Sequence, residues 1–238
     1  MSYTNSPLVS CTRLSPHNSG TRTRPIDRIT PHHAVGQMSA RAICEEFIAR
    51  NCSANYTIGY NGEVGMSVPE SMVAKTSGSY DNDSRAVTIE VADEPNPPYK
   101  VNAAAYERLI ELCVDICKRN GKDRLVWIDD KDKALAYRQK PNEMLLTVHR
   151  WFQYTLCPGQ TLLDSMPDLA EKVTAELQKD AKPKLDNTPS KWAKEAVEWA
   201  IDNGLMAGDK NGDLMLRSPI TREQFCVILK RYHDKFNK

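Results

Sequence analysis

Apolar residues recur at helical spacing in three long stretches of the chain, and each stretch predicts an amphipathic helix. The stretch 39–50 begins at Ser39, a favourable N-cap residue, with apolar positions that return to one face. The stretch 102–120 begins in the same way at Asn102. A third helix is expected over 162–179.

Runs of β-branched and apolar residues before and between these helices predict short strands. The predicted strands are 29–35, 55–60, 63–68, 85–92, 124–128 and 144–149. Asn61-Gly62 is the strongest turn signal, because this dipeptide favours the two-residue turn of a hairpin. Residues 1–27 carry no such pattern and are expected to form an irregular arm. The alternation predicts an α/β fold with a mixed central β-sheet flanked by helices.

The composition changes at 180–188, a polar stretch with a proline that predicts a linker. Beyond it, helices are expected over 189–203 and 222–236. The predicted organisation is a main domain over 1–179, the linker, and a small all-α helix–loop–helix module over 189–238. Two helices bury little surface, so this module is expected to dock on the main domain, to dimerise, or to be marginally stable.

Charge and hydropathy narrow the function classes. The 238 residues are 40% hydrophobic and 26% charged, with a formal net charge of +1. This balance gives no electrostatic basis for nucleic-acid binding. No apolar run approaches the roughly 18 residues that a membrane span needs. Residues 1–25 lack the apolar centre of a secretory signal, so a cytoplasmic chain is expected.

The seven cysteines indicate a reducing compartment, because their number is odd and their spacing is that of no disulfide framework. Cys113 and Cys117 lie one helical turn apart in an apolar stripe. Both are therefore expected to be buried thiols in a helix core.

The segment 147–159 carries the strongest chemical signal in the chain. His149 closes an apolar run, and Cys157 follows eight residues later, just before Pro-Gly. Zinc favours this mixture of nitrogen and sulfur, and a catalytic zinc needs three protein ligands with a fourth position open. His32 and His33, near the end of the first predicted strand, offer the third ligand. Strand side chains alternate, so only one of these two can bind.

A carboxylate lies between these segments. Glu90 follows a buried-type run in the strand 85–92 and is suited to move protons for an attacking water molecule. A glutamate in this position can also be solvated or paired with a cation. Together with the nitrogen and sulfur ligands, Glu90 favours a zinc hydrolase.

Four separated segments resemble the zinc-dependent N-acetylmuramoyl-L-alanine amidases, the family of peptidoglycan recognition proteins and phage endolysin amidases. The segments are Ile29–His32, Asn55–Gly62, Asn82–Ala92 and Thr147–Gly159, in the family's order. The resemblance implies a peptidoglycan hydrolase. Its substrate bond would be the amide between N-acetylmuramic acid and the L-alanine of the stem peptide, cleaved by zinc-activated water.

The resemblance also implies roles for single residues. The implied Zn²⁺ ligands are His32, His149 and Cys157. Glu90 takes the place of the family's acid/base glutamate. Many relatives have a lysine two residues before the last ligand, where this chain has Thr155, a weaker electrostatic partner for an oxyanion. Pro31 is a second departure, because proline removes a ladder donor and suits a strand end or edge.

The C-terminal module resembles a single S-layer homology motif. The matching segments are Trp192–Ala200, Gly204–Gly208 and Ile220–Phe225. The resemblance implies attachment to secondary cell-wall polymers, with the indole of Trp192 stacking on sugar and Arg222 binding acidic groups. The alternative is a core Trp192 and an ordinary first-turn Arg222. Such motifs usually work in threes, so a single copy indicates a homo-oligomer or a docking element.

The leading hypothesis is therefore a peptidoglycan amidase, a phage endolysin or an autolysin of a Gram-positive host, held in the cytoplasm until lysis. One alternative is a non-catalytic peptidoglycan-binding protein with the same fold. A second is a cysteine peptidase with Cys157 as nucleophile and His149 as base. Metal content and chelator sensitivity separate these hypotheses.

Overall fold

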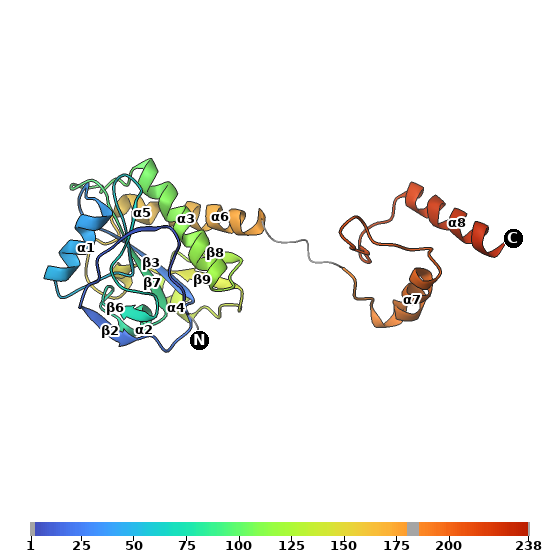
Figure 1. Cartoon of the computed structure of the whole chain (residues 1–238), viewed down its shortest axis with the longest axis horizontal. Coiled ribbons are helices and arrows are strands. Elements are labelled where there is room, and N and C mark those ends of the chain that lie inside the picture. Colours follow the sequence, from blue (N-terminus) through green and yellow to red (C-terminus); the bar gives the residue numbers. More distant parts are fainter. Residues whose placement is uncertain (1–2, 180–185, 238) are drawn as a thin grey trace. The chain divides into compact units, whose positions relative to one another are not determined.

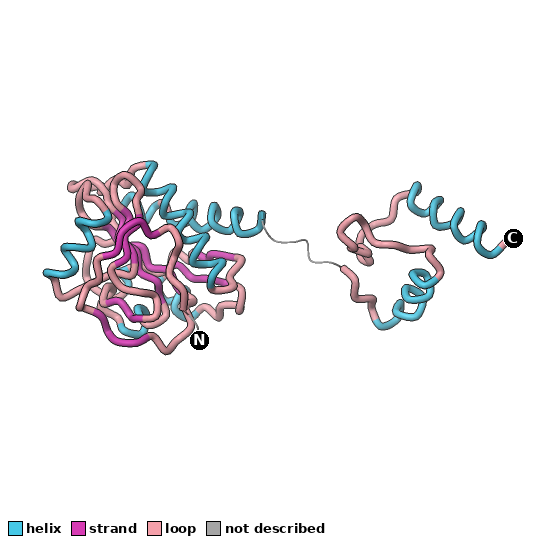
Figure 2. The backbone as a smooth tube through the Cα atoms, in the orientation of Figure 1, coloured by secondary structure: helices cyan, strands magenta, loops and turns pink. Residues whose placement is uncertain are grey.

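The computed structural model describes residues 3–179 and 186–237 of the chain (Figures 1 and 2). The chain divides into two compact units, Met1–Asp180 and Ala181–Lys238. Residues 180–185, which make up most of the predicted linker, lie outside the described residues.

The larger unit is built around a seven-stranded sheet with the order β1-β5-β4-β7-β3-β9-β8. Its strands are β1 (Val9–Thr12), β3 (Arg28–His33), β4 (Tyr56–Ile58), β5 (Val64–Met66), β7 (Ala86–Val91), β8 (Arg124–Val126) and β9 (Glu143–Leu146). β3 pairs in parallel with β7 and β9, whereas β4 and β5 form the predicted antiparallel hairpin. The mixed central sheet predicted from the sequence is confirmed.

Helices lie on both sides of this sheet (Figure 1). They are α1 (Ala40–Ala49), α2 (Tyr80–Asp83), α3 (Ala103–Arg119), α4 (Lys131–Ala136), α5 (Gln160–Asp164) and α6 (Met166–Lys179). The predicted caps of α1 and α3 are confirmed, since the side chains of Ser39 and Asn102 each accept a backbone N–H from the first turn. Cys113 and Cys117 are fully buried on α3, as predicted.

The two faces of the sheet differ in polarity, and β3 shows why. Ile29 joins the main hydrophobic core, together with Ile89 of β7 and residues of α3 and α6. Thr30 points to the opposite face, where its hydroxyl lies 2.8 Å from that of Thr147. His32 follows two residues later and therefore shares this polar face.

The prediction of an irregular arm over residues 1–27 is wrong. β1 pairs in parallel with β5, and a second ribbon is formed by β2 (Asn18–Thr21) and β6 (Met72–Ala74). The guanidinium of Arg22 is buried and donates to the carbonyl groups of Glu70, Met72, Asp83 and Ala86. These partners are distant in sequence, and the Ser-, Thr- and Asn-rich strands have no apolar period that would reveal them.

Other elements differ from their predictions in length. The helix expected over 162–179 is divided at Ser165 into α5 and α6, because Pro167 lacks the N–H that a continuous helix would use. β9 ends at Leu146, so His149 lies beyond the strand. The strand predicted over 124–128 is shorter and forms one edge of the sheet. α2 and α4 were not predicted, because they are too short to show a period.

Pro31 lies inside a central strand rather than at a sheet edge. The pairs between β3 and β9 end at Ile29, however, so Pro31 comes after the last of them. Its missing N–H removes the donor that would continue the ladder to β9, so pairing on that side stops here, and the strand continues along β7 as far as His33.

The smaller unit contains η2 (Lys191–Ala193), α7 (Lys194–Asp202) and α8 (Arg222–Phe236). Thr221 and Gln224 form a reciprocal capping box at the start of α8. None of these three helices contains a buried residue. Leu205, which follows α7, is buried, with 5% of its surface exposed. Within the described residues, no helix combines the length and apolar character that crossing a membrane requires.

Candidate metal centre

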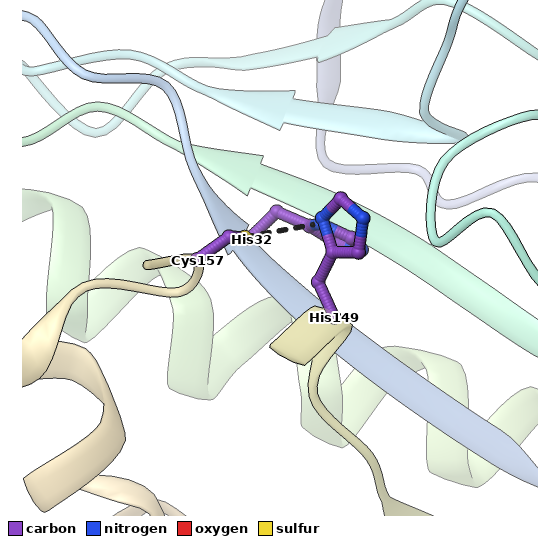
Figure 3. Close-up of side chains that lie close together, drawn as sticks. All are labelled: His32, His149 and Cys157. Atoms are coloured by element: carbon purple, nitrogen blue, oxygen red, sulfur yellow. Dashed lines mark hydrogen bonds between the residues drawn. The ribbon is translucent and has the colours of Figure 1, made fainter. Parts of the chain in front are cut away.

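Three segments that are far apart in the sequence bring one side chain each to the end of β3 (Figure 3). His32 comes from β3, His149 from the first position of the 3-10 helix η1 (His149–Trp151), and Cys157 from the loop before α5. One potential ligand atom of each residue lies within 4.8 Å of the other two. The structure therefore brings together the three residues predicted from the sequence as metal ligands.

His32 is 1% exposed and is the most enclosed of the three. Its Nδ1 lies 3.2 Å from the sulfur of Cys157, and its Nε2 has no hydrogen-bond partner among the described residues. Burial lowers the pKa of His32 well below its ordinary value, and the neighbouring His149 and His33 lower it further. The ring is therefore neutral and keeps a lone pair that a metal can accept.

Cys157 is held in place through the backbone of its loop. The guanidinium of Arg150 donates to the carbonyl groups of Leu156 and Cys157, and the hydroxyl of Thr155 accepts the N–H of Cys157 at 3.2 Å. Burial and the charge of Glu90 raise the pKa of the Cys157 thiol, while the N–H of His33 and the charge of Arg150 act in the opposite direction. Without a cation, the sulfur is a protonated thiol.

His149 and His32 approach each other as rings, with centroids 5.0 Å apart and planes inclined by 56°. The Nε2 of His149 lies 2.9 Å from the Oε1 of Gln153. Sequence reasoning missed Gln153, since an amide four residues after a histidine carries no chemical signal by itself.

Glu90 stands beside the cluster on the neighbouring strand. It is the register partner of His32, because β3 and β7 run in parallel. Burial, with a further contribution from the Asp93 carboxylate, raises the pKa of Glu90 from its ordinary 4.5 to about 8, although Arg50 opposes the shift. A carboxyl with this pKa can both accept and release a proton near neutral pH.

The side chain of His33 makes different contacts from that of His32. Its Nδ1 lies 2.9 Å from the carboxylate of Asp93, and its ring meets that of Tyr99 edge to face at a centroid distance of 4.8 Å. The same ring lies close to Gly159, where an added Cβ would come within 3.1 Å of it. His33 therefore braces the loop that carries Cys157, and it is His32 that joins the cluster.

The donor set fits a zinc ion. Two imidazoles and one thiol are ligands that zinc favours, and three protein ligands leave a position open, as in catalytic sites. The unpartnered Nε2 of the buried His32 supports this fit, because buried polar atoms ordinarily have a partner.

The two residues singled out in the smaller unit are both on its surface. Trp192 lies in η2 and is 90% exposed, so it is not a core residue of this unit. Arg222 is exposed in the first turn of α8. Both side chains are accessible to a ligand.

Comparison with known families and structures gives two sequence matches. Residues 22–160 match the family described as N-acetylmuramoyl-L-alanine amidase, and residues 185–226 match the S-layer homology domain. No curated protein matches the chain.

Several solved structures are similar to part of this chain. The amidase LysC from Clostridium intestinale is 20% identical and covers 70% of this chain and 97% of its own, with a TM-score of 0.44. A mutant endolysin from Bacillus subtilis is 16% identical, with 69% and 99% covered and a TM-score of 0.49. The Drosophila peptidoglycan recognition protein SA is 16% identical, with 66% and 90% covered and a TM-score of 0.45.

Proposed function

The chain belongs to the N-acetylmuramoyl-L-alanine amidase family, and we propose that His32, His149 and Cys157 hold the zinc ion on which its activity depends. The protein is a peptidoglycan amidase: it hydrolyses the amide between N-acetylmuramic acid and the L-alanine of the stem peptide. The convergence of the three ligand atoms within 4.8 Å is the observation that carries the proposal. A zinc ion in such a site acidifies water and polarises a carbonyl group.

Glu90 is proposed as the proton carrier of the reaction. Its carboxylate takes a proton from the attacking water and passes it to the departing nitrogen of L-alanine. The register pair with His32 and the raised pKa of Glu90 support this role. A divalent cation held by the three ligands would favour the charged form of the Glu90 carboxylate, which is the form that accepts a proton.

Thr155 is proposed to serve the site in two ways. Its oxygen accepts the N–H of Cys157, which fixes the direction of the metal-binding loop. The hydroxyl proton is then free to donate to the oxygen on which negative charge develops. A neutral hydroxyl stabilises this charge less than the lysine of many relatives.

The cysteine-peptidase alternative is less compatible with the site. A nucleophilic cysteine needs a lowered pKa and a neighbouring imidazolium. Burial here raises the pKa of Cys157, so its sulfur is a thiol without a metal, and the ring hydrogen-bonded to this sulfur is the neutral His32 rather than the proposed base His149.

The test is mass spectrometry of peptidoglycan digested by the full chain, with and without a chelator, together with the zinc content of the protein. We expect one zinc per chain and new L-alanine amino termini that disappear with chelation and return with zinc. Activity that survives chelation and ends with alkylation would establish the peptidase instead. Binding without cleavage by the zinc-loaded chain would establish the non-catalytic alternative.

For the C-terminal unit, we propose attachment to an acidic secondary wall polymer, with Trp192 and Arg222 as contacts. The S-layer homology match and the exposure of both side chains support this proposal. The proposed arrangement is a catalytic domain over 1–179, a linker over 180–188 and the wall-binding module over 189–238. It suits an endolysin or autolysin of a Gram-positive host. Sedimentation with purified walls, with and without their secondary polymer, tests the attachment against the W192A and R222A variants.

A further inference from the structure

The side chain of His149 has a hydrogen-bond partner that is not one of the proposed metal ligands. The Oε1 of Gln153 lies 2.9 Å from the Nε2 of His149. We propose that Gln153 is the positioning residue of His149, which fixes the tautomer and the direction of the ring that meets the metal. The inference rests on the proposed zinc site and adds a residue to it.

The chemistry of the two side chains sets the tautomer. An amide oxygen can only accept a hydrogen bond, so the Nε2 of His149 must carry the proton. Nδ1 then keeps the lone pair and is the nitrogen available to a cation. Ligating histidines commonly donate their other N–H in this way, and the partner fixes the ring and raises its basicity.

Gly78 supplies the space in which the amide of Gln153 lies. A Cβ at position 78 would come within 2.1 Å of the Nε2 of Gln153 and 2.3 Å of its Cδ. Gly78 also has a φ of +70°, a conformation that favours glycine. The amide therefore rests directly on the backbone of a loop between β6 and α2, far from Gln153 in sequence.

The turn between the two residues is already formed by the backbone. The N–H of Gln153 donates to the carbonyl of His149 at 3.2 Å, and the side-chain bond closes over the same turn. Gln153 is itself exposed, so its side chain contributes little to the hydrophobic core. Substitution at position 153 should consequently change the tautomer and the direction of the His149 ring and leave the fold intact.

The first experiment measures zinc affinity by competition with a chromogenic chelator. We expect Q153A to bind zinc about 10–100-fold more weakly than the unchanged chain, as for other partners of metal-binding histidines. Q153E keeps a hydrogen-bond acceptor, so its zinc affinity should stay within about fivefold of that of the unchanged chain. The matched control Q178A alters an exposed glutamine on α6 and should have no effect. A loss below about fivefold in Q153A, or one that Q153E does not restore, overturns the proposal.

Gly78 allows a double-mutant test of the same contact. G78A should displace the amide and weaken zinc binding, and the G78A/Q153A variant should bind no more weakly than Q153A alone. If the losses of zinc affinity in G78A and Q153A add in the double variant, Gly78 acts separately from Gln153. This result would overturn the proposed role of Gly78 in placing the amide.

The second experiment needs no metal. Long-range ¹⁵N–¹H spectra of the metal-free chain report which ring nitrogen of His149 carries the proton. We expect the Nε2–H tautomer in the unchanged chain and a mixture in Q153A. An Nδ1–H tautomer, or no change in Q153A, overturns the inference. A chain that shows the expected tautomer but binds no zinc would instead overturn the proposed metal function.

Discussion

His32 of β3 and Glu90 of β7 are register partners on adjacent parallel strands. Paired residues in a parallel sheet point to the same face, so the proposed ligand and the proposed proton carrier emerge side by side. The sheet, rather than a mobile loop, sets their separation. This rigidity allows the two functions, metal binding and proton transfer, to be altered one at a time.

Replacing Glu90 by glutamine should abolish most of the catalysis while leaving the metal in place. The amide keeps the shape of the side chain and cannot accept the proton of the attacking water. We expect kcat to fall by about 10²–10⁴-fold, with one zinc still bound. Full activity in E90Q, measured on purified peptidoglycan, would remove Glu90 from the reaction.

The same substitution should stabilise the metal-free chain at alkaline pH. The pKa of Glu90 is raised to about 8 in the folded chain, so the unfolded chain loses this proton first. The contribution of Glu90 to stability is therefore present at low pH and is lost as the pH rises from about 4.5 to 8. Because the side chain is partly exposed, we expect E90Q to gain roughly 1–3 kcal/mol at pH 8.5.

Urea unfolding of the metal-free proteins at pH 5 and pH 8.5 measures this difference. At pH 5 the Glu90 carboxyl of the folded chain is still protonated and uncharged, so the unchanged chain and E90Q should be nearly equally stable. An advantage of E90Q that is equal at both pH values would show that its cause is not the ionisation of Glu90.

Cysteine to serine at position 157 should remove zinc binding and preserve the fold. The hydroxyl is a much poorer ligand than a thiolate, and the backbone of the loop remains tied to Arg150. We expect loss of bound zinc by elemental analysis and loss of amidase activity, with an unchanged far-ultraviolet circular dichroism spectrum. Zinc retained at full stoichiometry by C157S would exclude Cys157 as a ligand.

Arg22 should be among the most costly single residues to replace in the larger unit. Its buried guanidinium donates to four carbonyl groups, and R22M would remove all of these donors at once. We expect a loss of about 3–5 kcal/mol in the free energy of unfolding. R24M is the matched control, because Arg24 is half exposed and its bond to Asp81 lies at the surface, worth about 0–1 kcal/mol. Similar midpoints for the two variants in urea would contradict the prediction.

Much of this centre could be predicted because local pattern and chemistry coincide. The alternation of β3 implies that only one of the two adjacent histidines can reach the metal, and the structure places His33 against Asp93 instead. The strand patterns around His32 and Glu90 are strong because both strands are buried. Residue type and local period therefore supplied the candidates, and the resemblance to the amidase family selected His32 over His33.

The features that were missed depend on partners distant in sequence. β1 is a strand because β5 offers it an edge, and nothing within its four residues shows this. The bond of Gln153 depends on the space above Gly78, which a sequence does not display. The break between α5 and α6 was missed although Pro167 stands in the sequence. The sequence does not show whether this proline lies in the first turn of a new helix or inside one longer helix.

The loop from His149 to Cys157 carries two of the three candidate ligands on one short stretch of chain. Release of the ion would therefore remove one link between this segment and β3, while Arg150 still holds the loop and the strands that carry His32 and Glu90 stay in place. An emptied enzyme of this design would remain a folded template that can take up its ion again without refolding.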